Sequence, residues 1–182
     1  MKKNILFLIL CIILFGSCDH FSNEPKVIPV NNQYSLTLPS YLSENESLHE
    51  NASLQYSNLF KELYVIVIDE VIADFNSALI DNSLTESYSS DIDGYTKIIL
   101  DNLALSIEDF SSPSMDKTVI NSMNARIATI EGNVEGIDVF YTFAAVEGKN
   151  NFYQIYTWTT ARKKENYKNK MQGIVRSIQE IY

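Results

Sequence analysis

Residues 137–160 read IDVFYTFAAVEGKNNFYQIYTWTT and carry the clearest structural pattern in the chain. Side chains alternate with a period of two on either side of a turn that contains Gly148, Asn150 and Asn151, which predicts a β-hairpin of two aromatic-rich strands. Beyond the hairpin, apolar residues recur at spacings of three and four and predict a helix; they are Tyr167, Met171, Ile174, Val175, Ile178 and Ile181. The hairpin and the helix can bury their apolar faces against each other.

The upstream sequence predicts further strands and one more helix. Short apolar or alternating runs indicate strands at 27–30, 34–38, 52–56, 63–68, 117–120 and 125–131. The run LYVIVI at 63–68 is apolar on both faces and is therefore expected in the interior of the sheet. Ser90 or Asp91 can cap a helix that ends near Asp109. For the acidic, serine-rich stretch 69–93, a helix and an irregular loop both stay open.

Apart from the small edge strand at 27–30, this order gives three strands, a helix, four strands and a helix. Consecutive strands on short turns favour an α+β fold, with a mostly antiparallel sheet of about six to seven strands and two main helices packed on it. Parts of the chain resemble the PsbP/Mog-like family: 34–39 near the domain start, and 141–143, 152–158 and 167–178 at the end. The resemblance covers roughly residues 28–182, mostly at positions expected in the core.

The resemblance implies an α/β/α sandwich around an antiparallel sheet. Family members include an extrinsic subunit of photosystem II and a Ran-binding protein, which act by docking to larger partners rather than by catalysis. The stretch 69–93 departs from the family pattern, and a bacterial leader points away from both of these partners. The resemblance therefore bears on the fold more than on a specific role.

The first 18 residues predict export and lipidation. Two lysines precede an uncharged run at 5–16, which at twelve residues is shorter than the roughly 20 that a membrane-spanning helix needs. The residues FGS before Cys18 resemble the lipobox of bacterial lipoproteins, with Phe15 where Leu is commoner. We therefore predict a protein held by lipid on Cys18 at a membrane of the bacterial cell envelope, divided into a signal peptide at 1–17, a lipidated cysteine and tether at 18–27, and a domain at 28–182.

The composition fits one globular domain behind this leader. Hydrophobic residues make up 46% and charged residues 20% of the chain, which is too apolar for disorder. The formal charge is −9, and it becomes −11 once Lys2 and Lys3 leave with the leader. A surface this acidic argues against nucleic acid, and against binding an anionic bilayer by charge. Loss of Cys11 with the leader would leave Cys18 alone, so no internal disulfide is expected.

The sequence offers few catalytic side chains. His20 lies in the tether and His49 in a polar loop without a Gly-x-Ser-x-Gly motif, so both are interpreted as solvated. The inventory of His and Cys excludes a zinc site built from them. Glycosidase-type chemistry needs two carboxylates facing one cleft, and Asp69 and Glu70 at the end of the central strand are the candidate pair. We predict no catalytic residue and no cofactor.

Two charged clusters are left to interpret. Asp91-Ile-Asp93-Gly94 resembles a fragment of a calcium loop, but a helix begins there, so the two aspartates are expected to cap it rather than to bind calcium. Cations also gather at the start of the last helix, where they oppose the macrodipole. They form either a solvated face paired with Glu165 and acidic loops, which is the favoured interpretation, or a site for an acidic partner, lipid headgroup or glycan; they are Arg162, Lys163, Lys164, Lys168 and Lys170.

Taken together, these observations favour a membrane-anchored, non-catalytic accessory or docking protein whose protein partner the sequence does not identify. Two alternatives stay open. A carrier of a small apolar ligand needs a cavity between sheet and helix, lined by residues such as Tyr141, Tyr156 and Trp158. A carboxylate-dependent hydrolase needs two acids that converge in a concave pocket.

Overall fold

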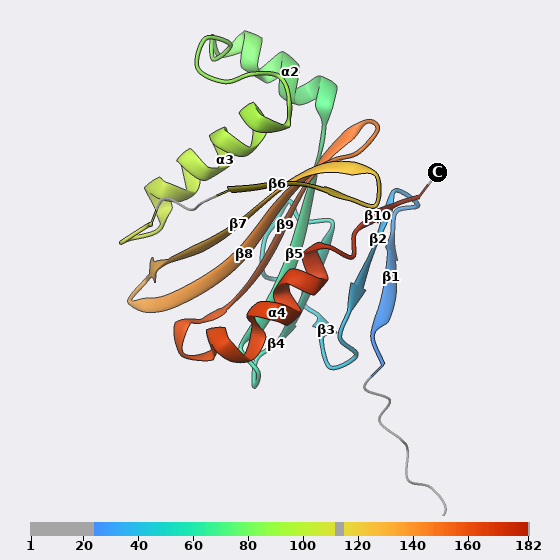
Figure 1. Ribbon diagram of the computed structural model, residues 1–182, viewed down its shortest axis with the longest axis vertical. Helices are drawn as coiled ribbons and strands as arrows, with labels where there is room; N and C mark the ends of the chain where they lie inside the picture. Colours follow the sequence, from blue (N-terminus) through green and yellow to red (C-terminus); the bar gives the residue numbers. More distant parts are fainter. Residues whose placement is uncertain (1–23, 112–114, 182) are drawn as a thin grey trace, which may run out of the picture.

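Two antiparallel β-sheets and three α-helices build the part of the chain that the computed structural model describes, residues 24–111 and 115–181 (Figure 1). The larger sheet has the strand order β3-β4-β5-β9-β8-β7-β6. Its strands are β3 Ser43–Glu44, β4 Leu54–Asn58, β5 Leu63–Val71, β6 Met115–Ile120, β7 Met123–Val134, β8 Ile137–Glu147 and β9 Asn151–Thr160. The predicted hairpin is confirmed as β8 and β9, which pair from Val139 opposite Thr160 to Glu147 opposite Phe152.

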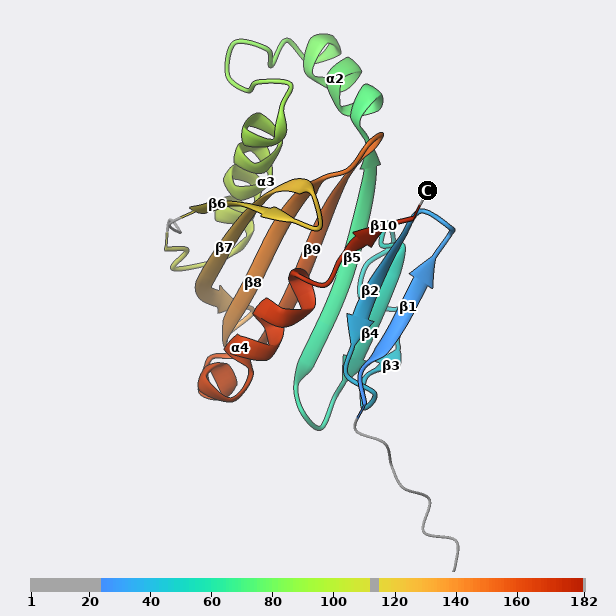
Figure 2. The same ribbon diagram turned by 45° about the vertical axis from the view of Figure 1, so that its right-hand side comes forward.

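The helices and the smaller sheet cover the two faces of the larger sheet (Figures 1 and 2). Helices α2 (Ile72–Asp81) and α3 (Ile92–Ser106) pack on one face, around Phe143 and Phe152. On the other face lie η2 (Ala161–Lys163), α4 (Lys164–Val175) and a sheet of order β1-β2-β10, around Ile155 and Met171. The smaller sheet consists of β1 Lys26–Val30, β2 Tyr34–Leu38 and β10 Gln179–Glu180. The α/β/α sandwich is therefore confirmed.

Strand alternation explains why one sheet supports two cores. Successive side chains of a strand point to opposite faces, so β8 sends Phe143 and Ala145 to the α2–α3 side, and Ala144 and Val146 to the α4 side. Strand β5 is interior, as predicted, because β4 and β9 flank it. None of the helices in the described ranges is long and apolar enough to cross a membrane.

The structure also corrects parts of the prediction. The open stretch 69–93 contains a helix, α2, so three α-helices are present in the described chain instead of two main ones. The last helix ends at Val175, short of the predicted apolar stripe, because the chain turns there and pairs Gln179 with Ser35 of β2. Strand β1 begins at Lys26, one residue before the strand predicted at 27–30, since Lys26 already pairs with Leu38.

Candidate functional site

A cleft of about 430 Å³ lies between α2, α3 and the face of β5 and β9 beneath them. The two helices supply its apolar walls, and the strands supply its floor. Ligand pockets typically span 300–1,000 Å³ and combine an apolar lining with a few polar groups, a description that this cleft meets. Its lining includes Phe75, Leu79, Leu84, Ile98 and Leu103 on the helical side and Glu70, Gln154 and Tyr156 on the sheet.

A chain of hydrogen bonds crosses the floor of the cleft. The Tyr156 hydroxyl donates to Gln154 Oε1 over 2.9 Å, and Gln154 Nε2 donates to the Tyr95 hydroxyl oxygen over 2.8 Å. Burial raises the pKa of Tyr95, and the neighbouring Glu70 carboxylate raises it further. Tyr95 therefore keeps its proton at physiological pH and acts as a neutral polar group, not as a base.

Aromatic packing fixes Tyr95 at this position. Its ring stacks on Phe152 with centroids 4.2 Å apart and an interplanar angle of 20°, while Phe75 meets Tyr95 edge-on at 4.9 Å. Such pairs hold a ring in one orientation as well as burying it. No sequence pattern predicts this cluster, because its members come from α2, α3 and β9. Gln154 was the available signal, as an amide among aromatics on one face of a predicted strand.

Only one of the three aromatic residues expected in a sheet–helix cavity lines the cleft. Tyr156 does so, next to Gln154. Tyr141 and Trp158 instead form a stacked row with Tyr64 across β8, β9 and β5, with centroid distances of 5.9 Å and 5.0 Å. These rings pack against one another as cross-strand neighbours, so their contribution is mainly to the sheet.

The acid pair proposed from the sequence does not converge. Asp69 and Glu70 are successive residues of β5 and point to opposite faces of the sheet. Glu70 lines the cleft beside Tyr95. On the other face, Asp69 accepts a hydrogen bond from Asn151 Nδ2 over 3.4 Å. Its negative charge adds to the effect of burial in raising the pKa of Tyr34 and of Tyr153. His49 is exposed in its loop and accepts a hydrogen bond from the Asn51 backbone N–H through Nδ1. Neither Asp69 nor His49 therefore gives Glu70 the second catalytic group that hydrolysis by a carboxylate pair needs.

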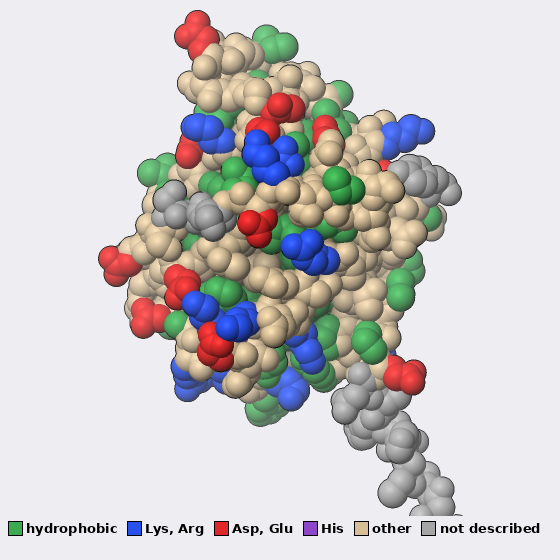
Figure 3. Space-filling view, in the orientation of Figure 1, with side chains coloured by type: hydrophobic (Ala, Val, Ile, Leu, Met, Phe, Trp, Pro, Cys, Tyr) green, Lys and Arg blue, Asp and Glu red, His purple; other side chains and the backbone are tan. Residues whose placement is uncertain are grey.

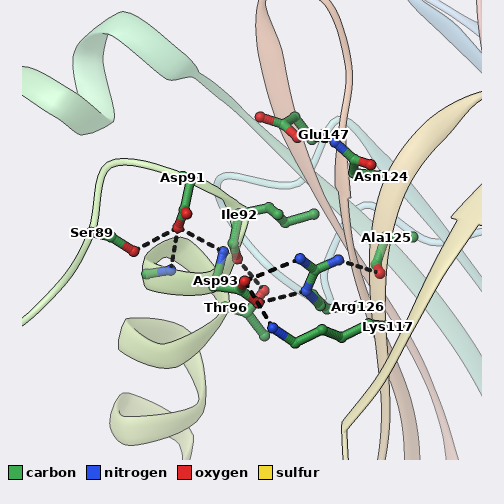
Figure 4. Close-up of polar contacts among 11 residues, drawn as sticks. Ser89, Asp91, Ile92, Asp93, Thr96, Lys117, Asn124, Ala125, Arg126 and Glu147 are labelled. Atoms are coloured by element: carbon green, nitrogen blue, oxygen red, sulfur yellow. Dashed lines mark hydrogen bonds and ion pairs between the residues drawn. The ribbon is translucent and has the colours of Figure 1, made fainter.

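The two aspartates that resembled a calcium loop are engaged with protein groups (Figure 4). Asp91 caps α3 by accepting from the backbone N–H groups of Asp93 and Gly94, each over 3.0 Å. Asp93 accepts from Arg126 Nε over 2.6 Å, from Arg126 Nη2 over 3.2 Å and from Lys117 Nζ over 2.9 Å. These two donors lower the pKa of Asp93 to about 2. Within the described ranges, no three His, Cys, Asp or Glu side chains form a metal-binding group.

Comparison with known proteins identifies the fold. No protein-family model matches the chain, and no curated protein is significantly similar to it in sequence. Among solved structures, the solution structure of cyanobacterial PsbP (CyanoP) from Synechocystis matches with a TM-score of 0.57 at 9% identity, over 93% of this chain and 99% of that one. This chain has a PsbP-like fold. A Pseudomonas aeruginosa protein of unknown function matches with a TM-score of 0.50 at 11% identity, over 85% of this chain and 95% of that one.

In this PsbP-like fold, four of the five cations predicted at the start of the last helix lie close to carboxylates. Arg162 and Lys163 share Glu62, Lys164 lies 2.6 Å from Glu131, and Lys168 lies 2.6 Å from Glu165. Thr160 and the two cations beside Glu62 lower the pKa of that carboxyl. Cys18 lies outside the described residues.

The fifth of these cations, Lys170, and Lys61 of the β4–β5 turn have a different partner. Lys61 and Lys170 lie over the ring of Tyr41, with their Nζ atoms 4.9 Å and 5.2 Å from its centroid. Neither lysine takes part in an ion pair among the described residues. Both line a hollow of about 650 Å³ together with Pro25 and Tyr41. Lys170 belongs to the cationic group predicted from the sequence, whereas Lys61 is 109 positions away in the sequence and is brought there by the β4–β5 turn.

Proposed function

We propose that this protein is a lipid-anchored, non-catalytic accessory module of the bacterial cell envelope. The observation that carries the proposal is the leader, in which two lysines, an apolar run and FGS precede Cys18. Two or three acyl chains on this cysteine would anchor the protein stably, since each buried CH₂ contributes about 0.8 kcal/mol. The PsbP-like domain then works within reach of the membrane, by docking to a larger partner.

The arrangement of the acids supports a docking role over hydrolysis. Asp69 and Glu70 face opposite sides of the sheet, Asp91 caps a helix, and Asp93 is held by Arg126 and Lys117. Each of these carboxylates therefore has a structural use or lacks a second acid facing it. A catalytic pair instead requires two carboxylates about 5–10 Å apart on either side of one bond.

The anchor is tested by mass spectrometry of the mature protein purified from its own membranes. We expect an N-terminal peptide that begins at Cys18 and carries the mass of a diacylglyceryl group and an amide-linked chain. A Cys18→Ala variant should lose that mass and leave the membrane fraction. An unmodified thiol at Cys18 would remove the anchor from the proposal. Crosslinking of the lipidated protein in cells, followed by identification of captured proteins, tests the docking role.

The cleft favours a second candidate function, that of a carrier for a small ligand with an apolar body and one polar group. Tyr95, Gln154 and Tyr156 would orient the polar group, and the helical walls would enclose the apolar part. Native mass spectrometry of the protein from its own cells should then detect a bound small molecule. Ala78→Trp, which places a large ring in the cleft wall, should abolish this binding, and Ala73→Trp on the same helix should preserve it. Absence of a bound small molecule from the native protein would contradict the carrier function and leave docking as the remaining proposal.

A further inference from the structure

One end of the molecule combines an exposed apolar tip with a concentration of cations. We call it the basal end and define it by the β4–β5 turn and nearby residues of η2 and α4: Leu59, Phe60, Lys61, Arg162, Lys163, Lys168 and Lys170. These residues include five of the 14 lysines and arginines of an otherwise acidic chain. Figure 3 shows Lys and Arg side chains gathered at the lower end of the molecule, around hydrophobic side chains at its lowest point.

The apolar tip, Leu59 and Phe60, is exposed to solvent on an ordered turn. Phe60 is 97% exposed and Leu59 is 68% exposed. Asn58 Oδ1 accepts from the Lys61 backbone N–H over 2.9 Å, and Lys163 Nζ donates to the Phe60 carbonyl over 3.2 Å. These bonds involve the backbone of residues 60 and 61, so they order the turn from which the exposed Phe60 side chain extends. A single exposed apolar residue is common on protein surfaces. Two adjacent exposed apolar residues surrounded by lysines and arginines are less common and indicate a binding surface.

The described part of the chain begins at the same end. Pro25 lines the hollow that also contains Tyr41, Lys61 and Lys170. Figures 1 and 2 agree that the start of β1, the β4–β5 turn and the start of α4 lie together at the lower end, whereas α2 lies at the opposite end. Six Cα–Cα steps separate Cys18 from Glu24, so even a fully extended tether reaches only about 20 Å. This step rests on the lipid anchor of the proposed function.

We propose that the basal end docks on the surface of the anionic phospholipid bilayer that holds the anchor. Leu59 and Phe60 enter the interfacial zone, while Lys61 and Lys170, which have no carboxylate partner among the described ion pairs, face headgroup phosphates. The net negative charge of the whole chain does not prevent this, because charges beyond about 8–10 Å are largely screened at physiological salt. Docking then directs the α2–α3 end, with its cleft, away from the membrane.

Site-specific fluorescence of the lipidated, mature protein tests this orientation. Loss of Cys11 with the leader and modification of Cys18 leave no free thiol, so Phe60→Cys introduces a unique labelling site. Ile80→Cys is the matched control, since Ile80 is also apolar and 68% exposed but lies on α2 at the far end. In vesicles of phosphatidylethanolamine and phosphatidylglycerol, an environment-sensitive dye at residue 60 should shift to the blue. Lipid-borne nitroxides should quench it several-fold more strongly than a dye at residue 80.

Charge reversal tests the headgroup contact. Lys170→Glu should reduce the shielding of the dye at residue 60 in anionic vesicles, and Lys149→Glu, at another exposed lysine in the β8–β9 turn at the other end, should leave it unchanged. Vesicle flotation separates the two proposals, because failure to float contradicts the anchor itself. Normal flotation with a water-exposed dye at residue 60 overturns docking alone. A dye shielded in native membranes but not in protein-free vesicles would assign this end to a protein partner and also overturn the lipid contact.

Discussion

At Gly94, in the first turn of α3, the preceding loop passes so close that a β-carbon would lie 1.9 Å from the Ser89 carbonyl oxygen and 2.5 Å from the Ser89 nitrogen. Both are backbone atoms that Asp91 and Ser89 hold in place through the helix cap. Only glycine fits without moving the loop. At Gly173 of α4, by contrast, a β-carbon would meet no neighbouring atom within 4 Å.

The two glycines therefore predict opposite effects of the same substitution. Gly94→Ala should destabilise the protein by about 2 kcal/mol or more, because the loop must shift away from α3. Gly173→Ala should stabilise it by up to about 1 kcal/mol, since alanine has the higher helix propensity and meets nothing. Urea unfolding of both variants measures the free energies. Equal effects at the two positions would contradict the close approach at Ser89.

Asp93 predicts a pH-dependent contribution to stability. Arg126 and Lys117 lower its folded-state pKa to about 2, below the ordinary value near 4. Stabilisation by the ionised carboxylate is therefore fully present above about pH 4 and is lost as the pH falls through about 2. Because the Asp93 side chain is 39% exposed, solvent screening limits the effect of Asp93→Asn at neutral pH to about 1 kcal/mol.

Unfolding curves at a series of pH values check this sign. The stability difference between wild type and Asp93→Asn should shrink steadily as the pH is lowered from neutral towards about 2. Asp116→Asn is the comparison, because Asp116 neighbours Lys117 on β6 and belongs to no ion pair in the described chain. A difference that grows on acidification would show that the ion pair does not operate as described.

The elements differ in how far the sequence could predict them. Strands β8 and β9 follow from alternation, because successive apolar side chains such as Phe143 and Ala144 enter opposite cores and so keep the period of two. Helix α2 buries only Phe75 and Leu79 of its ten residues and lies within a longer acidic, serine-rich stretch, so the surrounding composition obscures its helical spacing. The pairing of Tyr95 with Gln154 joins elements far apart in sequence, and no local pattern encodes it.

The carboxyl terminus shows how a continued periodicity can mislead. Ile178 and Ile181 extend the spacing of α4, yet α4 ends at Val175 and the following residues form β10 against β2. In the predicted helix both isoleucines would lie on the buried stripe. In the structure Ile178 is fully buried and its carbonyl accepts from Asn121 Nδ2 over 2.7 Å, whereas Ile181 is 38% exposed.

Alanine substitution of the two isoleucines distinguishes these arrangements. Ile178→Ala should cost about 2–5 kcal/mol, as removal of a buried side chain leaves a cavity in the core under α4. Ile181→Ala should cost less than about 0.5 kcal/mol, as expected for a surface position. The free energies of unfolding from denaturant titration give the comparison. Equally large losses of stability for the two variants would support a continuous helix and contradict the observed end of α4 at Val175.

At the scale of the whole molecule, the two candidate sites lie at opposite ends of the sheet. The cleft is formed by α2 and α3 at one end, and the apolar tip and its cations form the other end (Figures 1 and 2). A short anchor next to the basal end would orient the cleft away from the membrane, where ligands or partner proteins can reach it. This separation allows one end to bind lipid while the other remains accessible to a ligand or a partner.

Tether length gives the last prediction, because it separates docking with its own affinity from simple proximity. Insertion of about 20 glycine and serine residues directly before Glu24 adds a flexible segment with a root-mean-square span of about 25 Å, which lowers the effective concentration of the basal end at the bilayer. Flotation with vesicles should be unchanged, since the lipid on Cys18 remains. Shielding of the dye at residue 60 should fall but stay above that at residue 80, because Phe60 and the two lysines still favour the bilayer. The same linker added after the last residue should change neither measurement. If shielding at residue 60 drops to the level at residue 80, the short tether alone brings this end to the membrane.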